Sequence, residues 1–312
     1  MAKEIFLSVK NLHKFFGHKE VIHDLSFDLY SGEVLGFVGP NGAGKSTTIK
    51  LIMGFLSLDH GEIIICGKNH QTEYEAAMQH IGGIVENPEM YFNLSGRVNL
   101  EMYRRLHPGV KKSRVDEVIE LLKMQNRAND KVKRYSLGMK QRMCIAQALL
   151  HEPKVLILDE PTNGLDPSGI RELRDLLIYL AHKEGVAVLV SSHQLAEIQK
   201  MCDRVIIIDQ GRLIDNQPIN QMMKQSEDNL TLFKFVDAQN KKRALQLLQD
   251  SPFYKPSEFD QYSLVLAIEE NQIPEVIFRL SQAHIALTTV QPHYTNLEDI
   301  YLSITKGGKV IE

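Results

Sequence analysis

One stretch of this sequence decides its fold: Gly39-Pro40-Asn41-Gly42-Ala43-Gly44-Lys45-Ser46-Thr47. It matches the phosphate-binding pattern Gly-x-x-x-x-Gly-Lys-[Ser/Thr] at every fixed position. The glycines let the backbone curl without Cβ clashes, so that successive amide N–H groups point into a cradle for phosphate oxygens. An apolar run over residues 34–38 predicts a buried strand before the stretch, and residues 47–53 predict a helix whose N-terminus faces the phosphates. The stretch therefore predicts a site for a nucleoside triphosphate.

The side chains of this loop predict how the triphosphate is held. We expect Lys45 to bridge the β- and γ-phosphates and Ser46 to give its hydroxyl to Mg²⁺. Thr47 would add a donor on the α-phosphate side. Mg²⁺ is accordingly the expected cofactor.

Composition limits the possible partners and the compartment. The chain has 312 residues, 43% apolar content and a net charge of −3, which allows two domains with buried cores and offers no basic excess for nucleic acid. Cys66, Cys144 and Cys202 lack metal-ligand spacing, so we expect reduced thiols in a cytoplasmic protein. No apolar run of about 20 residues is present, so any membrane role is expected to come through another chain.

Two carboxylates follow a second apolar run. Residues 154–158 predict a buried parallel strand that delivers Asp159 and Glu160 at its C-terminal end, where open α/β sheets place their ligands. Asp159 would orient Mg²⁺ or its water shell, and Glu160 would polarise the attacking water. A further strand over residues 186–190 leads to His193, which we expect to reach the γ-phosphate from the parallel neighbour.

The rest of the first domain contains a β region and an inserted helical region. Residues 6–9 and 26–30 alternate as half-buried strands, and residues 13–17 are expected to form a loop between them. Phe15 and Phe16 in this loop are either core aromatics or include one that lies on an adenine ring. From about residue 88 to 150 the pattern becomes helical, with one apolar stripe formed by Val115, Val118, Ile119 and Leu122.

A second domain is expected from about residue 229. Strands over residues 230–236, 262–268 and 285–290 alternate with helices over residues 241–249 and 273–283. The stripe of the second helix comprises Ile273, Val276, Ile277 and Leu280. Thr295 and Glu298 predict a capping box for a last helix. This pattern predicts a small C-terminal α+β domain without a catalytic constellation.

Taken in order, the motifs resemble the ATP-binding subunit of ATP-binding cassette (ABC) transporters over about residues 4–220. They comprise the phosphate loop, Tyr135-Ser136-Leu137-Gly138-Met139-Lys140-Gln141-Arg142, the strand ending in Asp159 and Glu160, Asn163-Gly164-Leu165-Asp166, and His193. The resemblance implies an α/β P-loop NTPase cassette with a RecA-like core, an antiparallel β subdomain and an inserted helical subdomain. The cassette would span residues 4–225 and the C-terminal accessory domain residues 229–312.

The resemblance also implies residue roles. Phe16 looks like the aromatic that stacks on adenine, and Glu160 and His193 look like the catalytic base and the switch histidine. Ser136 and Gly138 stand where the family's signature contacts the γ-phosphate bound by an opposing subunit. Asp166 looks like the aspartate that contacts this second copy, so two copies would sandwich two ATP molecules.

Two departures from the family pattern are informative. The signature reads Tyr135-Ser136-Leu137-Gly138-Met139 instead of Leu-Ser-Gly-Gly-Gln, so it keeps the hydroxyl and the second glycine. The glutamine expected after the strand at residues 81–85 is Glu86, which becomes a candidate ligand of Mg²⁺ or its water. Glutamate here resembles the bacitracin-resistance and lantibiotic-immunity branch of the family, as does the C-terminal domain.

The resemblance implies an ATPase subunit that powers a bacterial exporter of an antimicrobial peptide, an antibiotic or a related compound. Its expected partners are a separate transmembrane permease and a second ATP-binding subunit, at the cytoplasmic face of the membrane. The alternative is a soluble cassette ATPase that acts on the ribosome or another cytoplasmic machine. Such proteins generally carry two cassettes in one chain, and this chain has one set of motifs, which favours the exporter.

Overall fold

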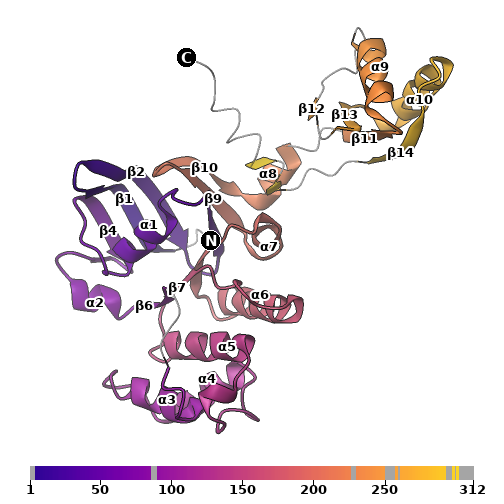
Figure 1. Cartoon of the computed structure of the whole chain (residues 1–312). Helices are drawn as coiled ribbons and strands as arrows, with labels where there is room; N and C mark the ends of the chain where they lie inside the picture. Colours follow the sequence, from indigo (N-terminus) through magenta and orange to yellow (C-terminus); the bar gives the residue numbers. More distant parts are fainter. Residues whose placement is uncertain are drawn as a thin grey trace. The chain divides into compact units, whose positions relative to one another are not determined.

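The computed structural model describes residues 4–85, 90–225, 230–249, 257–258, 261–292, 297–298 and 300–301. The chain forms two compact units, Met1–Ile219 and Asn220–Glu312 (Figure 1). The boundary lies before the one expected from the sequence, so most of helix α8 (Ile219–Gln225) belongs to the second unit. Each unit is described by itself below.

A six-stranded sheet with the order β10-β9-β3-β8-β7-β6 is the centre of the first unit. Its strands are β3 (Val34–Val38), β6 (Ile81–Ile84), β7 (Val155–Asp159), β8 (Ala187–Ser191), β9 (Arg204–Asp209) and β10 (Arg212–Pro218). All neighbours pair in parallel except β10, which joins β9 by a hairpin. Strands of such a sheet are covered on both faces, which explains their continuous apolar runs. The strands expected around residues 34–38, 154–159 and 186–190 are confirmed.

A four-stranded antiparallel sheet with the order β2-β1-β4-β5 packs on the same core. It contains β1 (Ile5–Phe16), β2 (Lys19–Tyr30), β4 (His60–Ile65) and β5 (Lys68–Asn69). The prediction of a loop at residues 13–17 is wrong, because β1 continues to Phe16. This residue pairs with Lys19 of β2 across a tight turn. The register shifts along this pair, and Asn11 and Asp24 have positive φ values of 46° and 50°. These irregularities interrupt the two-residue alternation and so hide the long hairpin in the sequence.

The helices of the first unit lie around the large sheet and in a separate helical group. Around this sheet are α1 (Lys45–Ile52), α6 (Pro167–His182) and α7 (Leu195–Met201), whereas α2 (Tyr74–Met78) packs against β4 and β5 of the antiparallel sheet. The helical group consists of α3 (Gly96–Arg104), α4 (Ser113–Leu121), η1 (Val132–Arg134) and α5 (Leu137–Ala148), and Figure 1 shows α5 beside α6. The apolar stripe expected for α4 is confirmed, since all four of its residues are buried.

The second unit has a sheet with the order β12-β13-β11-β14, in which all neighbours are antiparallel. Its elements are β11 (Leu230–Phe235), α9 (Ala238–Leu248), β12 (Ser257–Glu258), β13 (Ser263–Ala267), η2 (Glu270–Gln272), α10 (Ile273–Gln282) and β14 (Leu287–Pro292). Val276 and Leu280 of α10 are fully buried, but Ile277 is 38% exposed. The apolar stripe expected for α10 therefore included one exposed residue, Ile277, because the small sheet covers only one side of the helix. Leu297 and Ile300 are buried, whereas Thr295 of the expected capping box lies outside the described residues.

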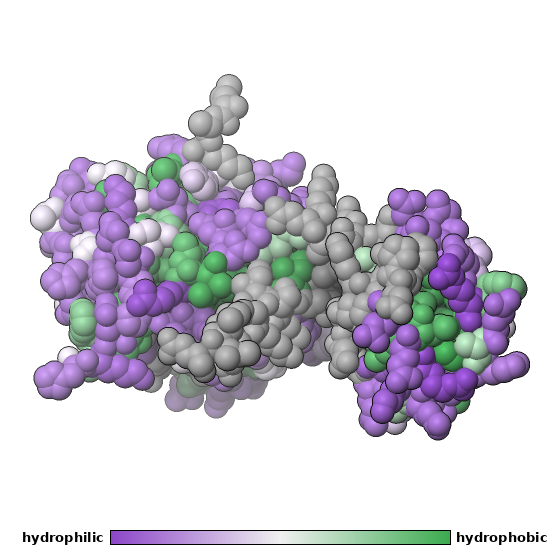
Figure 2. Space-filling view, turned by 90° about the horizontal axis from the view of Figure 1, so that it is seen from above, coloured by the Kyte–Doolittle hydropathy of each residue, from purple (hydrophilic) through white to green (hydrophobic). Residues whose placement is uncertain are grey.

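On the face that Figure 2 shows, the coloured surface of each unit is mostly hydrophilic, with apolar residues in separate patches. Within the described ranges, none of the helices has the length and apolar character needed to cross a bilayer.

Candidate functional site

The phosphate loop joins β3 to α1, as expected, and its glycines meet two different steric demands. A Cβ on Gly39 would lie 2.3 Å from the carbonyl oxygen of Ile208 on the neighbouring β9, so no side chain fits there. Gly44 has a φ of 106°, a conformation that favours glycine, and it directly precedes α1. The chain therefore turns from a buried strand into a helix N-terminus within a few residues, which is the geometry that binds phosphate groups.

Lys45 is held within this loop. Its ammonium donates to the carbonyl oxygens of Gly39 at 2.7 Å and Pro40 at 3.2 Å, and the residue is buried. Burial lowers the pKa of the Lys45 ammonium, while the carboxylates of Glu160 and Asp159 act in the opposite direction. A positive charge thus lies beside the loop and within the field of both carboxylates.

The other loop residues present their groups at the start of α1. Ser46 is exposed in the first turn and Thr47 is half-buried. Pro40, Asn41 and Gly42 are exposed, whereas Ala43 is buried. The hydroxyl of Ser46 is therefore accessible to a ligand bound at the loop.

The two carboxylates expected at the end of β7 are tied together by a residue to which the sequence assigned no role. Ser191 ends the adjacent β8 and pairs in register with Asp159. Its hydroxyl donates to Asp159 Oδ1 at 2.5 Å and accepts the backbone N–H of Glu160 at 2.8 Å. Ser191 is fully buried, and Glu160 has a positive φ of 49°. The sequence signal was a polar residue directly after the apolar run of β8, but only the strand order places it beside Asp159.

His193 reaches the same edge of the sheet. Its Nδ1 lies 2.8 Å from Glu160 Oε2, and 53% of its side chain is exposed, against 22% for Glu160. The ends of β3, β7 and β8 thus gather Lys45, Asp159, Glu160 and His193, as the sequence predicted for parallel strands.

The two phenylalanines before Gly17 lie at the end of β1 rather than in the core. Phe15 is 37% exposed and Phe16 is 50% exposed, so the core alternative is wrong. Phe15 packs edge-on to His60 with ring centroids 6.5 Å apart, and the ammonium of Lys14 lies 5.7 Å from the Phe16 ring centroid. The face of an exposed ring such as Phe16 is suited to stacking on a base.

Ser136, Gly138 and Asp166 form a separate surface at the starts of α5 and α6. Together with Leu165 and Ser168 they line a shallow pocket of about 430 Å³. Ser136 caps α5 by accepting the N–H of Met139 at 3.3 Å, and Asp166 caps α6 by accepting the N–H of Gly169 at 3.1 Å. The hydroxyl of Ser168 and this N–H lower the pKa of Asp166. The hydroxyl of Ser136 and the carboxylate of Asp166 therefore have a structural role as helix caps.

Mg²⁺ fits the oxygen groups at the loop. The hydroxyl of Ser46 and the carboxylate of Asp159 are hard oxygen ligands of the kind this ion prefers. Since Ser191 occupies Asp159 Oδ1, the second carboxylate oxygen remains for a ligand. Glu86, the third candidate ligand, lies outside the described residues.

Comparison with known proteins places this geometry in a family. Residues 22–163 match the family model described as ABC transporter. The chain is 46% identical over 310 residues to the ABC transporter ATP-binding protein YhcH of Bacillus subtilis, covering 97% of each chain. It is 31% identical over 312 residues to the bacitracin transport ATP-binding protein BcrA of Enterococcus faecalis, covering 99% of each chain. A solved structure of an ATP-binding subunit of an ABC transporter superposes with a TM-score of 0.63 at 30% identity, covering 70% of this chain and 92% of the other.

The fold, the order of the motifs and the similarity along the whole chain agree. The α/β cassette fold expected from the sequence is that of these structures. The chain therefore belongs to the ATP-binding subunits of ABC transporters, which hydrolyse ATP to power transport, in the branch that includes the bacitracin and lantibiotic transport ATP-binding proteins.

Proposed function

We propose that this chain hydrolyses MgATP at the loop between β3 and α1, with Glu160 as the general base. The observation that carries the proposal is the convergence of Lys45, Asp159, Glu160 and His193 at the ends of three neighbouring parallel strands. Residues 39–47 bind the triphosphate through backbone amides, the Lys45 ammonium and the hydroxyls of Ser46 and Thr47. Phe16 stacks on the adenine.

The residues around the γ-phosphate divide the work. Glu160 accepts the proton of the attacking water. His193 orients the Glu160 carboxylate, because the two side chains lie within hydrogen-bond distance. Ser191 is a positioning residue, because its hydroxyl joins the Asp159 carboxylate to the backbone of Glu160. In this arrangement Asp159 is available to hold Mg²⁺, and Glu160 is available to accept the proton of water.

Ser46 and Asp159 would hold the Mg²⁺, and Glu86 is the further ligand that we propose. When bound, the ion neutralises charge on the β- and γ-phosphate oxygens. Asp159 contributes through the oxygen that Ser191 leaves free.

The surface formed by Ser136, Gly138 and Asp166 serves a second ATP-binding subunit. A Cβ added to Gly138 would meet only Leu165 Cδ2 at 3.8 Å, so packing within the described chain does not require glycine here. The close approach of a phosphate group to the start of α5 would require it. We therefore propose that Ser136 and Gly138 contact the γ-phosphate held by the second subunit, and that Asp166 contacts that subunit.

We further propose that the subunit powers export of an antimicrobial peptide, an antibiotic or a related compound through a separate transmembrane permease. The names of relatives, including the bacitracin transport protein of Enterococcus faecalis, support this class of cargo. Its place would be the cytoplasmic face of the membrane. The transport relatives do not favour the ribosome-acting alternative. The second unit serves as an accessory domain in this proposal and adds no group to the catalytic step.

The Glu160→Gln variant tests the catalytic proposal. Glutamine has nearly the shape of glutamate but does not accept the proton of water, so binding and chemistry should separate. We expect near-normal ATP affinity, nearly complete loss of hydrolysis, and an ATP-bound dimer in size-exclusion chromatography. Glu75→Gln, a change at an exposed carboxylate on α2, is the matched control and should keep the normal rate. Normal hydrolysis by Glu160→Gln would refute the assignment and make His193 the next candidate base.

A further inference from the structure

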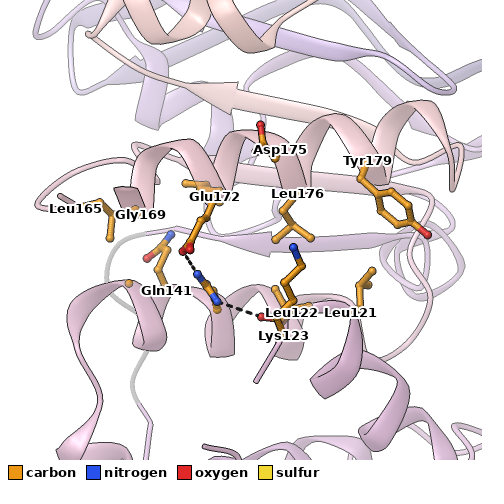
Figure 3. A pocket seen from close by; sticks show the side chains of 13 residues that line it. Leu121, Leu122, Lys123, Gln141, Leu165, Gly169, Glu172, Asp175, Leu176 and Tyr179 are labelled. Carbon is orange, nitrogen blue, oxygen red and sulfur yellow. Dashed lines mark hydrogen bonds and ion pairs between the residues drawn. The ribbon is translucent and has the colours of Figure 1, made fainter. Parts of the chain in front are cut away.

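A second pocket, of about 350 Å³, lies between α5, α6 and the end of α4 (Figure 3). Its walls are mainly apolar and comprise Leu121, Leu122, Leu165, Leu173 and Leu176. Tyr179 also lines the pocket. Its hydroxyl is already used as a donor to Glu184 at 2.8 Å, so its aromatic ring is the part that is available to a ligand. Neither the phosphate loop nor the carboxylates at the end of β7 line this pocket. Its size and its apolar lining are those of a small-molecule site.

The acidic side chains that line this pocket are not available to pair with a ligand. Glu172 of α6 forms an ion pair with Arg142 of α5, which also donates to the carbonyl oxygen of Leu122 at 3.5 Å. Figure 3 shows the carboxylate of Asp175 turned away from the slot between the two helices. The acidic lining groups are therefore either paired or directed elsewhere.

Lys123 is different. It lies two residues after the end of α4, and Figure 3 shows its ammonium extending toward Leu176 of α6. Within the described part of the chain, this ammonium has neither a salt bridge nor a hydrogen bond, whereas Arg142 has both. The pocket thus combines apolar walls with one cation that has no partner among the described residues.

We propose that this pocket binds an amphiphilic anion, namely an apolar body of about two fused rings that carries one carboxylate or sulfonate. The body would contact the leucines and the ring of Tyr179, and the anionic group would pair with Lys123. A cationic ligand is disfavoured, because it would lie beside Lys123 while the carboxylate of Glu172 is already paired with Arg142. A few directed polar groups in an otherwise apolar site are what sets specificity in such pockets.

The position of the pocket links it to the surface for the second subunit. Its walls include Gly138, Leu165 and Gly169, which also line the pocket of Ser136 and Asp166. An anion between α5 and α6 therefore sets the spacing of two helices whose caps form that surface. Resting on the function proposed above, the anion and ATP-driven dimerisation would influence each other, and this influence is reciprocal by thermodynamic necessity.

The test uses 8-anilinonaphthalene-1-sulfonate as the probe, titrated by fluorescence into the full chain without nucleotide. Lys123→Glu reverses the charge at the pocket and should weaken binding about tenfold, since losing the attraction and adding a repulsion costs on the order of 1.4 kcal/mol. Lys112→Glu, at the opposite end of α4, is the matched control and should leave the affinity within about twofold of the normal value. The uncharged analogue N-phenyl-1-naphthylamine should bind both variants equally.

Two outcomes would overturn the proposal. One is an unchanged sulfonate affinity in Lys123→Glu, and the other is an equal loss of the uncharged analogue, which would show damage to the pocket rather than loss of a charge pair. Leu176→Glu provides a second variant, with Leu213→Glu on the exposed β10 as its control. If Leu176→Glu binds the sulfonate normally, the probe sits elsewhere and the assignment fails.

The experiment is independent of the nucleotide site. Sulfonate binding should be unchanged in Lys45→Ala, so a failure of the ATP assignment would not alter it. Linkage is measured by repeating the titration on the ATP-bound Glu160→Gln dimer, where we expect the sulfonate affinity to shift by at least about threefold. Equal affinity with and without ATP would refute the linkage to dimerisation.

Discussion

Replacing Ser191 with alanine tests how the carboxylates at the end of β7 are held. The substitution removes one buried hydroxyl that makes two hydrogen bonds, to Asp159 at 2.5 Å and from Glu160 at 2.8 Å. The methyl group that remains makes neither. The phosphate loop and Lys45 are untouched, so nucleotide binding and catalysis should respond differently.

The expected size follows from these two bonds. Leaving the part-buried N–H of Glu160 unpaired costs up to about 1–3 kcal/mol, and the bond to the charged Asp159 contributes a similar amount. Because one side chain makes both, we expect the free energy of unfolding to fall by about 2–3 kcal/mol and the thermal midpoint by roughly 4–12 °C. Displacing a catalytic group by about 1 Å can cost on the order of 100-fold in rate, so we expect kcat to fall about 10- to 100-fold.

Steady-state hydrolysis and thermal unfolding measure the two effects separately. The KM for ATP should change by less than about threefold, because the loop that binds the phosphates keeps its contacts. Ser191→Thr restores the hydroxyl and should recover most of kcat. Ser192→Ala is the matched control, since its equally buried hydroxyl accepts only the N–H of Gln194 at 3.0 Å. It should lower stability without a comparable loss of kcat.

The reasoning fails if Ser191→Ala keeps kcat within about threefold of the normal value. It also fails if Ser192→Ala loses kcat to the same extent, because the effect would then be a general consequence of a disturbed strand end.

Three further predictions concern other parts of the chain. Lys45→Ala should abolish tight ATP binding, measured with a fluorescent ATP analogue, because the cradle loses its side-chain cation; unchanged affinity would contradict the loop assignment. Burial lowers the pKa of His151. Below the ordinary histidine pKa of about 6.5, the unfolded chain therefore takes up a proton at His151 that the folded chain does not. The free energy of unfolding consequently decreases as the pH is lowered. His151→Gln, which still offers a donor to the Ile81 carbonyl oxygen, should lose less of its thermal midpoint between about pH 7 and 5; an unchanged pH profile would argue against this role. A chain truncated after Gln225 should still bind ATP, measured by the same fluorescence titration, and loss of binding would mean that the second unit completes the site.

Much of the fold could be predicted because its central strands are long apolar runs with clear ends. The residues that bind or react stand at or directly after the ends of such runs, as Asp159 does at the end of β7 and Gly39 after β3. Where the pattern is irregular, prediction failed. The bulged hairpin of β1 and β2 looks like a loop, and the exposed Ile277 looks like part of a core stripe.

The sequence by itself determined the phosphate loop, the pair of carboxylates and the histidine, because each is a short motif whose chemistry depends on local spacing. Only the tertiary structure decided which residues from distant strands share hydrogen bonds. Ser191 lies 32 residues after Asp159 and becomes its partner because β8 pairs in parallel with β7 in one particular register. In the same way, Lys123 after α4 and Leu176 of α6 are 53 positions apart in number and line one pocket only because the end of α4 lies beside α6 in the folded chain. Contacts of this kind depend on strand order and helix packing, which local sequence patterns do not encode.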